Sequence, residues 1–291
     1  MTICDASATL VAMLMSITRS PRILALALCT FTLIAAQSAS PPPASAPAAT
    51  PTTTAPRERL LVFSKTASFR HDSIPNAIEC VRELLADRYD IDATEDASVF
   101  TADNLKRYRC VIFASTTGDI LDAAQQTAFE GFIRAGGGFA GIHAAADTEH
   151  TWPWYGSLVG AYFKTHPTPQ EATIIVEDRT HRSTRMLPER WTRFDEWYVY
   201  DHNPRSEVKV LASLDDATVT GVSMNGDHPI AWYHEFDGGR AWYTGGGHTK
   251  ESYKEELFRN HVKQGVLWAA GASDESVPGT TTVKPAAQLS R

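Results

Sequence analysis

The stretch GGGFAGIHAAAD, residues 136–147, decides the fold of this chain. Three glycines lead into a short apolar run, residues 138–142, which predicts a buried strand. The run ends at His143, and the small residues and Asp147 that follow predict the start of a helix. In a strand–turn–helix of this form the residue at the turn is often a nucleophile, and here that residue is a histidine.

Strand and helix patterns alternate before this stretch. Apolar runs predict strands at residues 59–64, 89–93 and 110–114, and helical spacing predicts helices at residues 74–85 and 121–135, with a helical turn at residues 105–108. Such alternation predicts an α/β fold with a doubly wound, mostly parallel sheet. Ligands of these sheets bind beyond the carboxyl ends of the strands, which here are residues 64–71, 115–119 and 143–147.

The second half of the chain changes character. Short and often alternating segments occur at residues 171–176, 193–200, 208–214, 230–234 and 241–244. They predict an antiparallel extension of the same sheet rather than a separate domain. Residues 253–270 are amphipathic and predict a closing helix.

The two ends of the chain differ in composition from the predicted domain, residues 58–271. Residues 1–39 combine Arg19 and Arg22 with an apolar run too short to span a bilayer and then small residues, which predicts a cleaved secretory signal peptide. An uncleaved anchor and a lipid attached at Cys29 are the alternatives. Residues 40–57 predict a linker rich in proline and alanine, and residues 272–291 predict a disordered tail. We therefore expect a secreted or periplasmic protein with no stable membrane span after cleavage.

Composition limits the partners. The chain has 291 residues, is 43% hydrophobic and carries a formal charge of −7, so it can form one large domain with a substantial core. An acidic chain without a stripe of lysine or arginine is not expected to bind nucleic acid. In the predicted domain, Cys80 and Cys110 are expected to be two buried thiols rather than a disulfide, and no cysteine spacing matches a zinc site.

Ten histidines are present, and several stand at predicted strand ends or beside glycine or proline. His71 follows the first predicted strand, His143 occupies the turn, and His248 follows three glycines, which permit close backbone approach. His166 and His228 each precede a proline, which favours an extended conformation at both positions.

Acidic and aromatic residues complete the candidate site. Asp147 lies four residues after His143 and is expected on the same side of the helix start. Glu196 and Tyr198 belong to the segment DEWY, residues 195–198, which we interpret as a strand with both side chains on one face.

Three aromatic residues follow the histidine turn directly. Trp152, Trp154 and Tyr155 offer flat apolar faces, and such faces can line a sugar pocket. Trp152 and Tyr155 are therefore candidate substrate-binding residues.

Taken together, the motifs resemble the ThuA-like (trehalose-utilisation) family. The resemblance covers residues 58–271 and rests, in order, on GGGFAGIHAAAD, WPWYGSLVGAYFKTHPTPQEATIIVED, LPERW, DEWY, DHPIAWYHEFDGGRAWYTGGGHT and FRNHVKQGVLWAAG. It implies a flavodoxin-like fold of the class I glutamine amidotransferase-like superfamily, in agreement with the α/β pattern. It also implies a role in carbohydrate use, especially of disaccharides oxidised at C3 to keto-sugars. The amidotransferases carry a cysteine nucleophile in G-x-C-x-G, whereas this chain has His143, so glutamine amidotransferase activity is not expected.

The leading hypothesis is an enzyme that processes 3-keto-disaccharides by acid–base chemistry. A ketone at C3 acidifies the C2 hydrogen, so a base can remove it and the C1 substituent can leave by β-elimination. His143 is the candidate base, with Asp147 to orient it. Glu196 and Tyr198 are candidates for the acid or for holding hydroxyl groups.

The remaining histidines are expected to bind substrate or metal. His71, His166 and His248 are candidates for polarising substrate oxygens, and with His143 they are candidate ligands of a divalent metal. A hydratase or isomerase, a metal-dependent hydrolase and a non-catalytic periplasmic sugar-binding protein are the alternatives. The expected partner is a small carbohydrate, and a homo-oligomer is compatible with the sequence.

Overall fold

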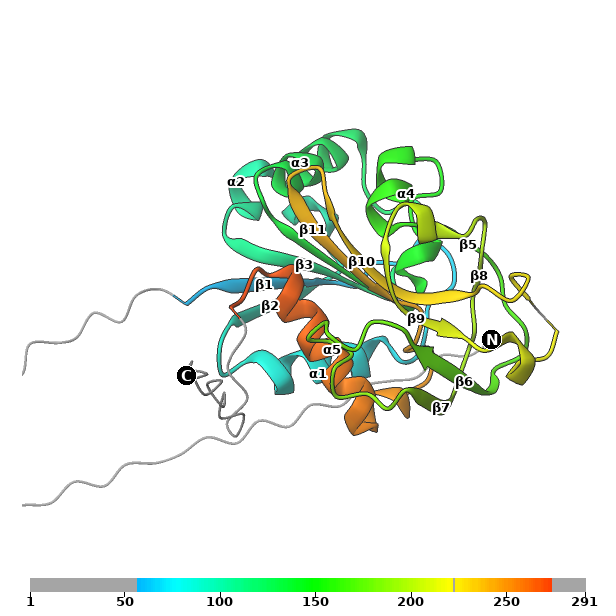
Figure 1. Cartoon of the computed structure of the whole chain (residues 1–291). Helices are drawn as coiled ribbons and strands as arrows, with labels where there is room; N and C mark the ends of the chain where they lie inside the picture. The colour runs from blue at the N-terminus through cyan, green and yellow to red at the C-terminus, as the bar shows by residue number, and fades with distance from the viewer. Residues whose placement is uncertain (1–56, 222, 274–291) are drawn as a thin grey trace, which may run out of the picture. The chain divides into compact units, whose positions relative to one another are not determined.

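A nine-stranded sheet in the order β2-β1-β3-β4-β11-β10-β9-β6-β7 organises residues 57–221 and 223–273, which the computed structural model describes (Figure 1). The parallel part consists of β2 (Asp90–Thr94), β1 (Arg59–Phe63), β3 (Tyr108–Ala114), β4 (Gly138–Ile142) and β11 (Gly239–Thr244). The antiparallel part consists of β10 (Pro229–Phe236), β9 (Lys209–Leu214), β6 (Gln170–Val176) and β7 (Arg190–Asp195). The predicted α/β class with an antiparallel extension is confirmed.

Helices cover both faces of the sheet, as a doubly wound fold requires. In Figure 1, α2 (Ala102–Leu105), α3 (Ala123–Arg134) and α4 (Pro153–Val159) lie on one side, and α1 (Ile74–Leu85) and α5 (Glu256–Ala269) lie on the other. The sequence pattern did not predict α4. Short 3₁₀ turns are η1 (Ala97–Val99), η2 (His143–Asp147), η3 (Pro204–Ser206), η4 (Asp216–Thr218) and η5 (Ser252–Lys254).

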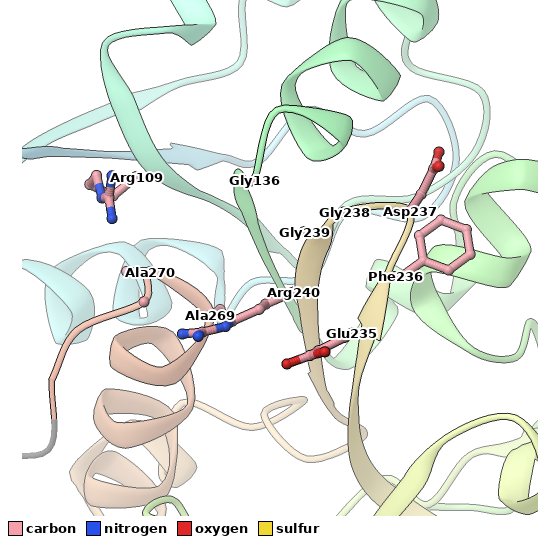
Figure 2. Close-up of a pocket in the computed structure, with 11 residues that line it drawn as sticks. Arg109, Gly136, Glu235, Phe236, Asp237, Gly238, Gly239, Arg240, Ala269 and Ala270 are labelled. Atoms are coloured by element: carbon pink, nitrogen blue, oxygen red, sulfur yellow. The ribbon is translucent and has the colours of Figure 1, made fainter.

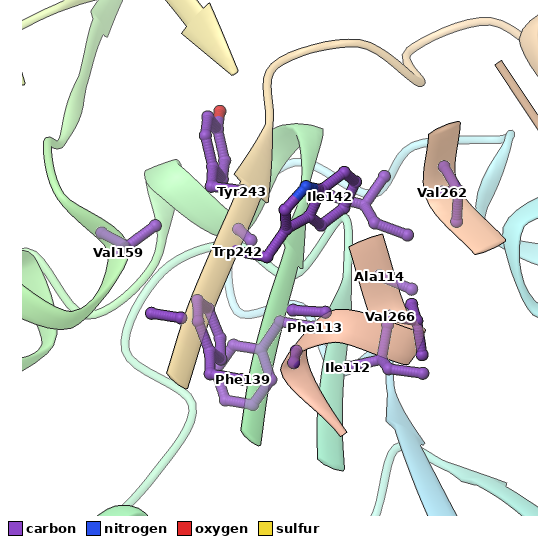
Figure 3. Close-up of a cluster of buried hydrophobic side chains, with 14 of the residues drawn as sticks. Ile112, Phe113, Ala114, Phe139, Ile142, Val159, Trp242, Tyr243, Val262 and Val266 are labelled. Atoms are coloured by element: carbon purple, nitrogen blue, oxygen red, sulfur yellow. The ribbon is translucent and has the colours of Figure 1, made fainter. Parts of the chain in front are cut away.

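The core lies on both faces of the central strands. Phe113 and Phe139 pack against one another with ring centroids 5.5 Å apart, and Trp242 is buried beside Val262 and Val266 of α5 (Figure 3). Residues of β4 are buried along the whole strand. Burial on both faces explains why the central strands read as continuous apolar runs.

Strand β11 corrects one prediction. We expected residues 241–244 to belong to the antiparallel extension, but β11 pairs in parallel with β4. Asp237 and Gly238 form the two-residue turn before it, both with positive φ, which is the usual connection of a tight hairpin. The hairpin reverses the chain, so the carboxyl end of β11 meets those of β3 and β4 at one edge.

The segment at residues 193–200 is a second correction. It is not one strand: β7 ends at Asp195, and β8 (Val199–Tyr200) pairs separately with β5 (Phe163–Thr165). Residues 196–198 form the link between the two sheets. Glu196 and Tyr198 therefore belong to a connecting segment and not to one face of a strand, although both lie beside His143.

Other sequence predictions divide into those the structure tests and those it does not. Cys80 and Cys110 are buried free thiols, as predicted, and burial raises the pKa of Cys80 to about 11. Across the described part of the chain, no helix is both long and apolar enough to cross a bilayer. The predicted signal peptide and almost all of the linker and tail lie outside the described residues.

Candidate functional site

His143 stands at the carboxyl end of β4 in a left-handed conformation, with φ of 50°. This conformation is uncommon for a residue other than glycine and persists only where surrounding contacts impose it. Nδ1 of His143 lies 2.9 Å from the carbonyl oxygen of Gly245, and the Tyr243 hydroxyl donates to the His143 carbonyl at 2.8 Å. Since a carbonyl only accepts, Nδ1 carries the proton and the Nε2 lone pair is free for chemistry.

Three histidines and one glutamate converge at this point. His71, His143, Glu196 and His248 each offer one ligand atom, and these atoms lie within 4.8 Å of one another. They come from the loop after β1, the end of β4, the β7–β8 link and the loop after β11. Parallel strands bring their carboxyl ends to one edge of the sheet, so residues far apart in sequence meet there.

The spacing of the ligand atoms matches a divalent metal. Nε2 of His143 lies 3.4 Å from Oε2 of Glu196, Nδ1 of His248 lies 3.2 Å from the same oxygen, and the two nitrogens are 3.3 Å apart. Zinc bonds of about 2.0–2.1 Å in a tetrahedron put neighbouring ligand atoms about 3.3 Å apart. Charge-assisted N–H···O bonds are shorter, at roughly 2.7–2.9 Å. The triangle therefore fits coordination of one ion better than direct hydrogen bonding.

His71 supports the same interpretation. It is 5% exposed, and its Nδ1 has no hydrogen-bond partner among the described residues. Burial, with the neighbouring His143 and His248, lowers the pKa of His71 to about 3. A neutral imidazole with an unused buried nitrogen is the form that binds a metal.

Glu196 and His248 form a charged pair without metal. Burial opposes ionisation of Glu196, but the neighbouring imidazoles of His143 and His248 outweigh it and hold its pKa well below the ordinary range. The hydrogen bond to Glu196 raises the pKa of His248. Glu196 is therefore an anion at neutral pH, which excludes the predicted role of proton donor.

Asp195 holds the backbone of the loop that carries His248, a role that the sequence interpretation missed. Its carboxylate is buried and accepts hydrogen bonds from the backbone N–H groups of Gly247 at 2.8 Å and His248 at 3.0 Å. Arg193 neutralises it at 2.6 Å. Gly247 has φ of 113°, and a Cβ there would lie 2.7 Å from the Tyr253 hydroxyl, so glycine is needed for this approach. The acidic pair in DEWY was the only signal for Asp195.

His166 lies at the rim of the cluster rather than among the four ligands. Its Nδ1 is 3.1 Å from Oε1 of Glu196 and 2.9 Å from the Pro167 carbonyl oxygen. Both partners accept, so Nδ1 donates and Nε2 keeps a lone pair. The side chain is 41% exposed, unlike that of Glu196 at 6%. His166 thus orients Glu196 while its other nitrogen remains available at the surface.

Tyr198, a candidate for the acid or for holding hydroxyl groups, lies at the site with its ring against that of His143. The two ring centroids are 4.4 Å apart, and the ring of Phe163 packs on the other side at 4.2 Å. Burial, reinforced by the Glu196 and Asp147 carboxylates, raises the pKa of Tyr198 well above its ordinary value. Tyr198 therefore remains a neutral phenol that forms a wall of the site.

Asp147 does not orient His143. Its Oδ1 lies 2.9 Å from Nε2 of His150, and the Gly245 carbonyl takes the orienting role instead. The prediction assumed an α-helix after His143, whereas η2 is a 3₁₀ turn. At three residues per turn, a residue four positions on is displaced by about a third of a turn from the first.

Trp152 and Tyr155 do not line a pocket at the site. Trp152 is 8% exposed and stacks on Trp154 at 5.1 Å. Tyr155 is fully buried and donates to the Ala145 carbonyl at 2.6 Å. Helix α4, which begins at Pro153, turns both rings into the core. Phe69, which the sequence interpretation overlooked, is the exposed aromatic residue nearest the cluster: it is 63% exposed, and its ring lies 4.8 Å from that of His71.

Two hollows elsewhere on the described surface do not contain the cluster. A cavity of about 480 Å³ lies at the amino ends of β4 and β11, where Arg240 donates to the Trp268 carbonyl and Arg109 pairs with Glu58 (Figure 2). An apolar groove of about 720 Å³ lies between α2 and α3. Neither hollow is lined by any of the four converging residues. Those four residues lie at the carboxyl ends of the strands, whereas the first cavity lies at the amino ends of β4 and β11.

Metal affinity is expected to increase as the pH rises past the ordinary histidine pKa of about 6.5. His248 has a raised pKa, and its proton must leave before Nδ1 can coordinate. His248 itself should contribute the opposite trend to the stability of the metal-free fold, because a raised pKa in the folded state adds stability at low pH that is lost as the pH rises through it. The lowered pKa values of His71, His234 and His261 contribute in the other direction, so the contribution of His248 is the difference between the unchanged protein and His248→Gln. Zn²⁺ titration calorimetry and urea unfolding of metal-free protein across this range test both signs. In His248→Gln the Zn²⁺ affinity should depend less on pH, and the stability lost relative to the unchanged protein should be larger at low pH than at high pH. Identical pH dependences in the two proteins would contradict the assignment.

Comparisons with known proteins agree with this architecture. The family model described as ThuA, trehalose utilisation, matches residues 59–269. A ThuA-like protein from Bacteroides uniformis superposes with a TM-score of 0.62 at 25% identity, covering 77% of this chain and 95% of that one. A ThuA-like protein from Parabacteroides merdae gives 0.63 at 18% identity, covering 77% and 94%.

A more distant similarity concerns the fold alone. A cytoplasmic protein from Salmonella typhimurium superposes with a TM-score of 0.51 at 13% identity, covering 72% of this chain and 99% of that one. No curated protein matches the sequence. Since the family model spans most of the chain, the protein belongs to the ThuA family of trehalose-utilisation proteins.

Proposed function

We propose that this protein is a divalent-metal-dependent enzyme that removes a proton beside the ketone of a keto-sugar. The observation that carries the proposal is the convergence of His71, His143, Glu196 and His248 at the carboxyl edge of the sheet. Family membership supports the broader role in carbohydrate utilisation. The keto-sugar substrate and the reaction are the proposal.

The four converging residues would hold the metal. A divalent ion at this position would stabilise negative charge on a ketone oxygen. Nε2 of His143, with its tautomer set by Gly245, faces Glu196 and His248. His143 therefore acts as a ligand in this proposal and not as the base expected from its place at the turn.

His166 is the base in this proposal. Its Nδ1–H bond to Glu196 leaves the Nε2 lone pair at the exposed rim, where a substrate can approach. His166 takes the C2 proton of a 3-keto-disaccharide, the C1–O bond breaks, and a C1–C2 double bond forms next to the ketone. The departing oxygen takes a proton from water. Tyr198, as a neutral phenol, keeps an uncharged wall beside His143.

The test uses 3-keto-trehalose and trehalose with the Zn²⁺-loaded and Mn²⁺-loaded protein. In D₂O, we expect metal-dependent exchange of the C2 hydrogen of the keto-sugar, followed by release of glucose, both followed by NMR. Trehalose should be unchanged. If 3-keto-trehalose binds but neither exchange nor products are detected under any metal condition, the proposed enzymatic function is refuted. The alternative of a non-catalytic sugar-binding protein would then be favoured. Cleavage of trehalose itself would identify a metal-dependent hydrolase instead.

Phe69 is expected to bind the sugar ring at the mouth of the site. Its backbone is held in place, because the Thr117 hydroxyl donates to the Phe69 carbonyl at 2.8 Å, while the ring remains 63% exposed beside His71. We expect Phe69→Ala to raise KM for the keto-sugar about fivefold, since an exposed aromatic contact of this kind contributes on the order of 1 kcal/mol, and to leave Zn²⁺ affinity unchanged. Phe194→Ala, which removes another ring that is 54% exposed, is the control and should leave KM unchanged. An unchanged KM in Phe69→Ala would remove this contact from the proposal.

A further inference from the structure

His228 is a buried histidine outside the candidate site whose ring nitrogens both have partners. Nδ1 lies 2.6 Å from Oδ1 of Asp216, and Nε2 lies 2.8 Å from the carbonyl oxygen of Tyr198. The residue is fully buried at the start of β10, where it precedes Pro229. It therefore links the loop before β10 to the backbone that carries Glu196 and Tyr198.

The hydrogen bonds define the charge of His228. A peptide carbonyl can only accept, so Nε2 of His228 donates to Tyr198. Asp216 already accepts, on its other oxygen, from the Ser223 hydroxyl at 2.7 Å and from the backbone N–H groups of Met224 at 3.1 Å and Gly226 at 3.0 Å. An oxygen with three donors belongs to a carboxylate, so Nδ1 also donates and the ring is an imidazolium.

The charges around the pair agree with this assignment. Burial opposes ionisation of Asp216, but hydrogen bonds from Ser223, His228 and Gly226 outweigh it and lower its pKa. Asp227, the preceding residue, is engaged by Arg205 at 2.5 Å and by Asn203 at 2.9 Å. Asp216 is thus the counter-ion that His228 contacts directly.

The same loop holds the β7–β8 link at a second place. Nε1 of Trp197 donates to the Gln170 carbonyl at 2.9 Å, and the Gln170 side chain accepts from the backbone N–H of Thr220 at 2.9 Å. The link is therefore held by the side chain of Trp197 and by the backbone carbonyl of Tyr198. Glu196 is the adjacent residue, and it is the one carboxylate among the four ligands.

We propose that the His228 imidazolium, held by Asp216, is a positioning residue that fixes the backbone of residues 196–198 and so places Glu196 against the metal. The inference rests on the proposed metal site. His228 does not touch the metal ligands or the substrate, and it acts through the Tyr198 carbonyl. Glutamine carries both of its N–H donors on one nitrogen, so it cannot reach the two acceptors that contact separate nitrogens of the His228 ring, and it releases one of them.

The experiment measures Zn²⁺ affinity by competition with a chelator in three variants of the full-length protein. His228→Gln is expected to weaken Zn²⁺ binding about 10–100-fold, the range for groups that orient a metal ligand. Asp216→Asn keeps an acceptor for Nδ1 but removes the counter-ion, and should weaken binding in the same direction. His234→Gln is the matched control, because His234 is also buried on β10 and bonds a carbonyl, that of Leu158 at 2.9 Å, away from the link.

A second measurement is independent of metal. Nitrogen-15 NMR of the imidazole rings of the unchanged, metal-free protein should show a histidine with both nitrogens protonated whose signal is absent from His228→Gln but present in His248→Gln, which removes the other histidine of a charged pair. If this signal is present while the wild-type protein binds no Zn²⁺, the proposed function fails and the charged state of His228 stands. Zn²⁺ affinity in folded His228→Gln equal to that of His234→Gln would overturn the positioning role. If His228→Gln does not fold, wild-type affinity in folded Asp216→Asn overturns it.

Discussion

Replacing Glu196 with glutamine is expected to abolish stoichiometric binding of a divalent metal and, with it, catalysis. Glutamine has nearly the same shape but removes the only negative charge among the four converging ligand residues. Changes in groups that only orient ligands already cost about 10–100-fold in metal affinity, so loss of this ligand should cost more than about 100-fold. Loss of metal-stabilised charge amounts to several kcal/mol, which lowers kcat/KM by roughly 10³-fold or more.

Metal content by elemental analysis and kcat/KM for 3-keto-trehalose measure the two effects. Glu171→Gln, at an exposed position of β6, is the control and should retain both metal and activity. Full activity of Glu196→Gln with no metal bound would refute the metal-dependent mechanism. Full metal content with lost activity would instead move the role of Glu196 from the metal to the substrate.

Replacing Arg193 with methionine is expected to reduce the free energy of unfolding by about 3–5 kcal/mol, the usual cost of leaving one partner of a buried ion pair unpaired. The side chains of Arg193 and Asp195 are 3% and 0% exposed, so the variant leaves the Asp195 carboxylate buried without this cation. Arg193 also donates to Glu255 and to Ser252, which join β7 to the start of α5. Urea unfolding of metal-free protein gives the change.

The same strand provides the matched control. Arg190 pairs with Asp215 at 2.7 Å, but its side chain is 58% exposed. Arg190→Met should therefore change stability by no more than about 1 kcal/mol. Equal losses of unfolding free energy in the two variants would show that burial does not determine how much the Arg193–Asp195 pair contributes to stability.

The sequence predicted the fold well because the local patterns are strong. The apolar run at residues 138–142 becomes β4 with the same bounds, and the helical spacing at residues 74–85 becomes α1. His143 lies at the strand end as expected, and His71 and His248 meet it there. Position at a strand end is a local property, so sequence can show it.

The details of the site depend on interactions between distant segments. Nothing local distinguishes β11 as a strand parallel to β4, because that pairing is set by the whole sheet. The orientation of Asp147 depends on whether the turn has three or 3.6 residues per turn, which small residues do not determine. The burial of Trp152 and Tyr155 depends on α4, which is too short to give a clear periodic pattern.

The central position of β11 has a consequence for biosynthesis. The edge of β4 cannot be covered until residues 239–244 have left the ribosome, although β4 itself ends at Ile142. The nascent chain therefore carries an unpaired and apolar strand edge from the synthesis of Ile142 until that of Thr244, and such edges are the parts of a folding chain that aggregate. Truncated products that stop before β11 should be insoluble, because the edge of β4 stays unpaired in them.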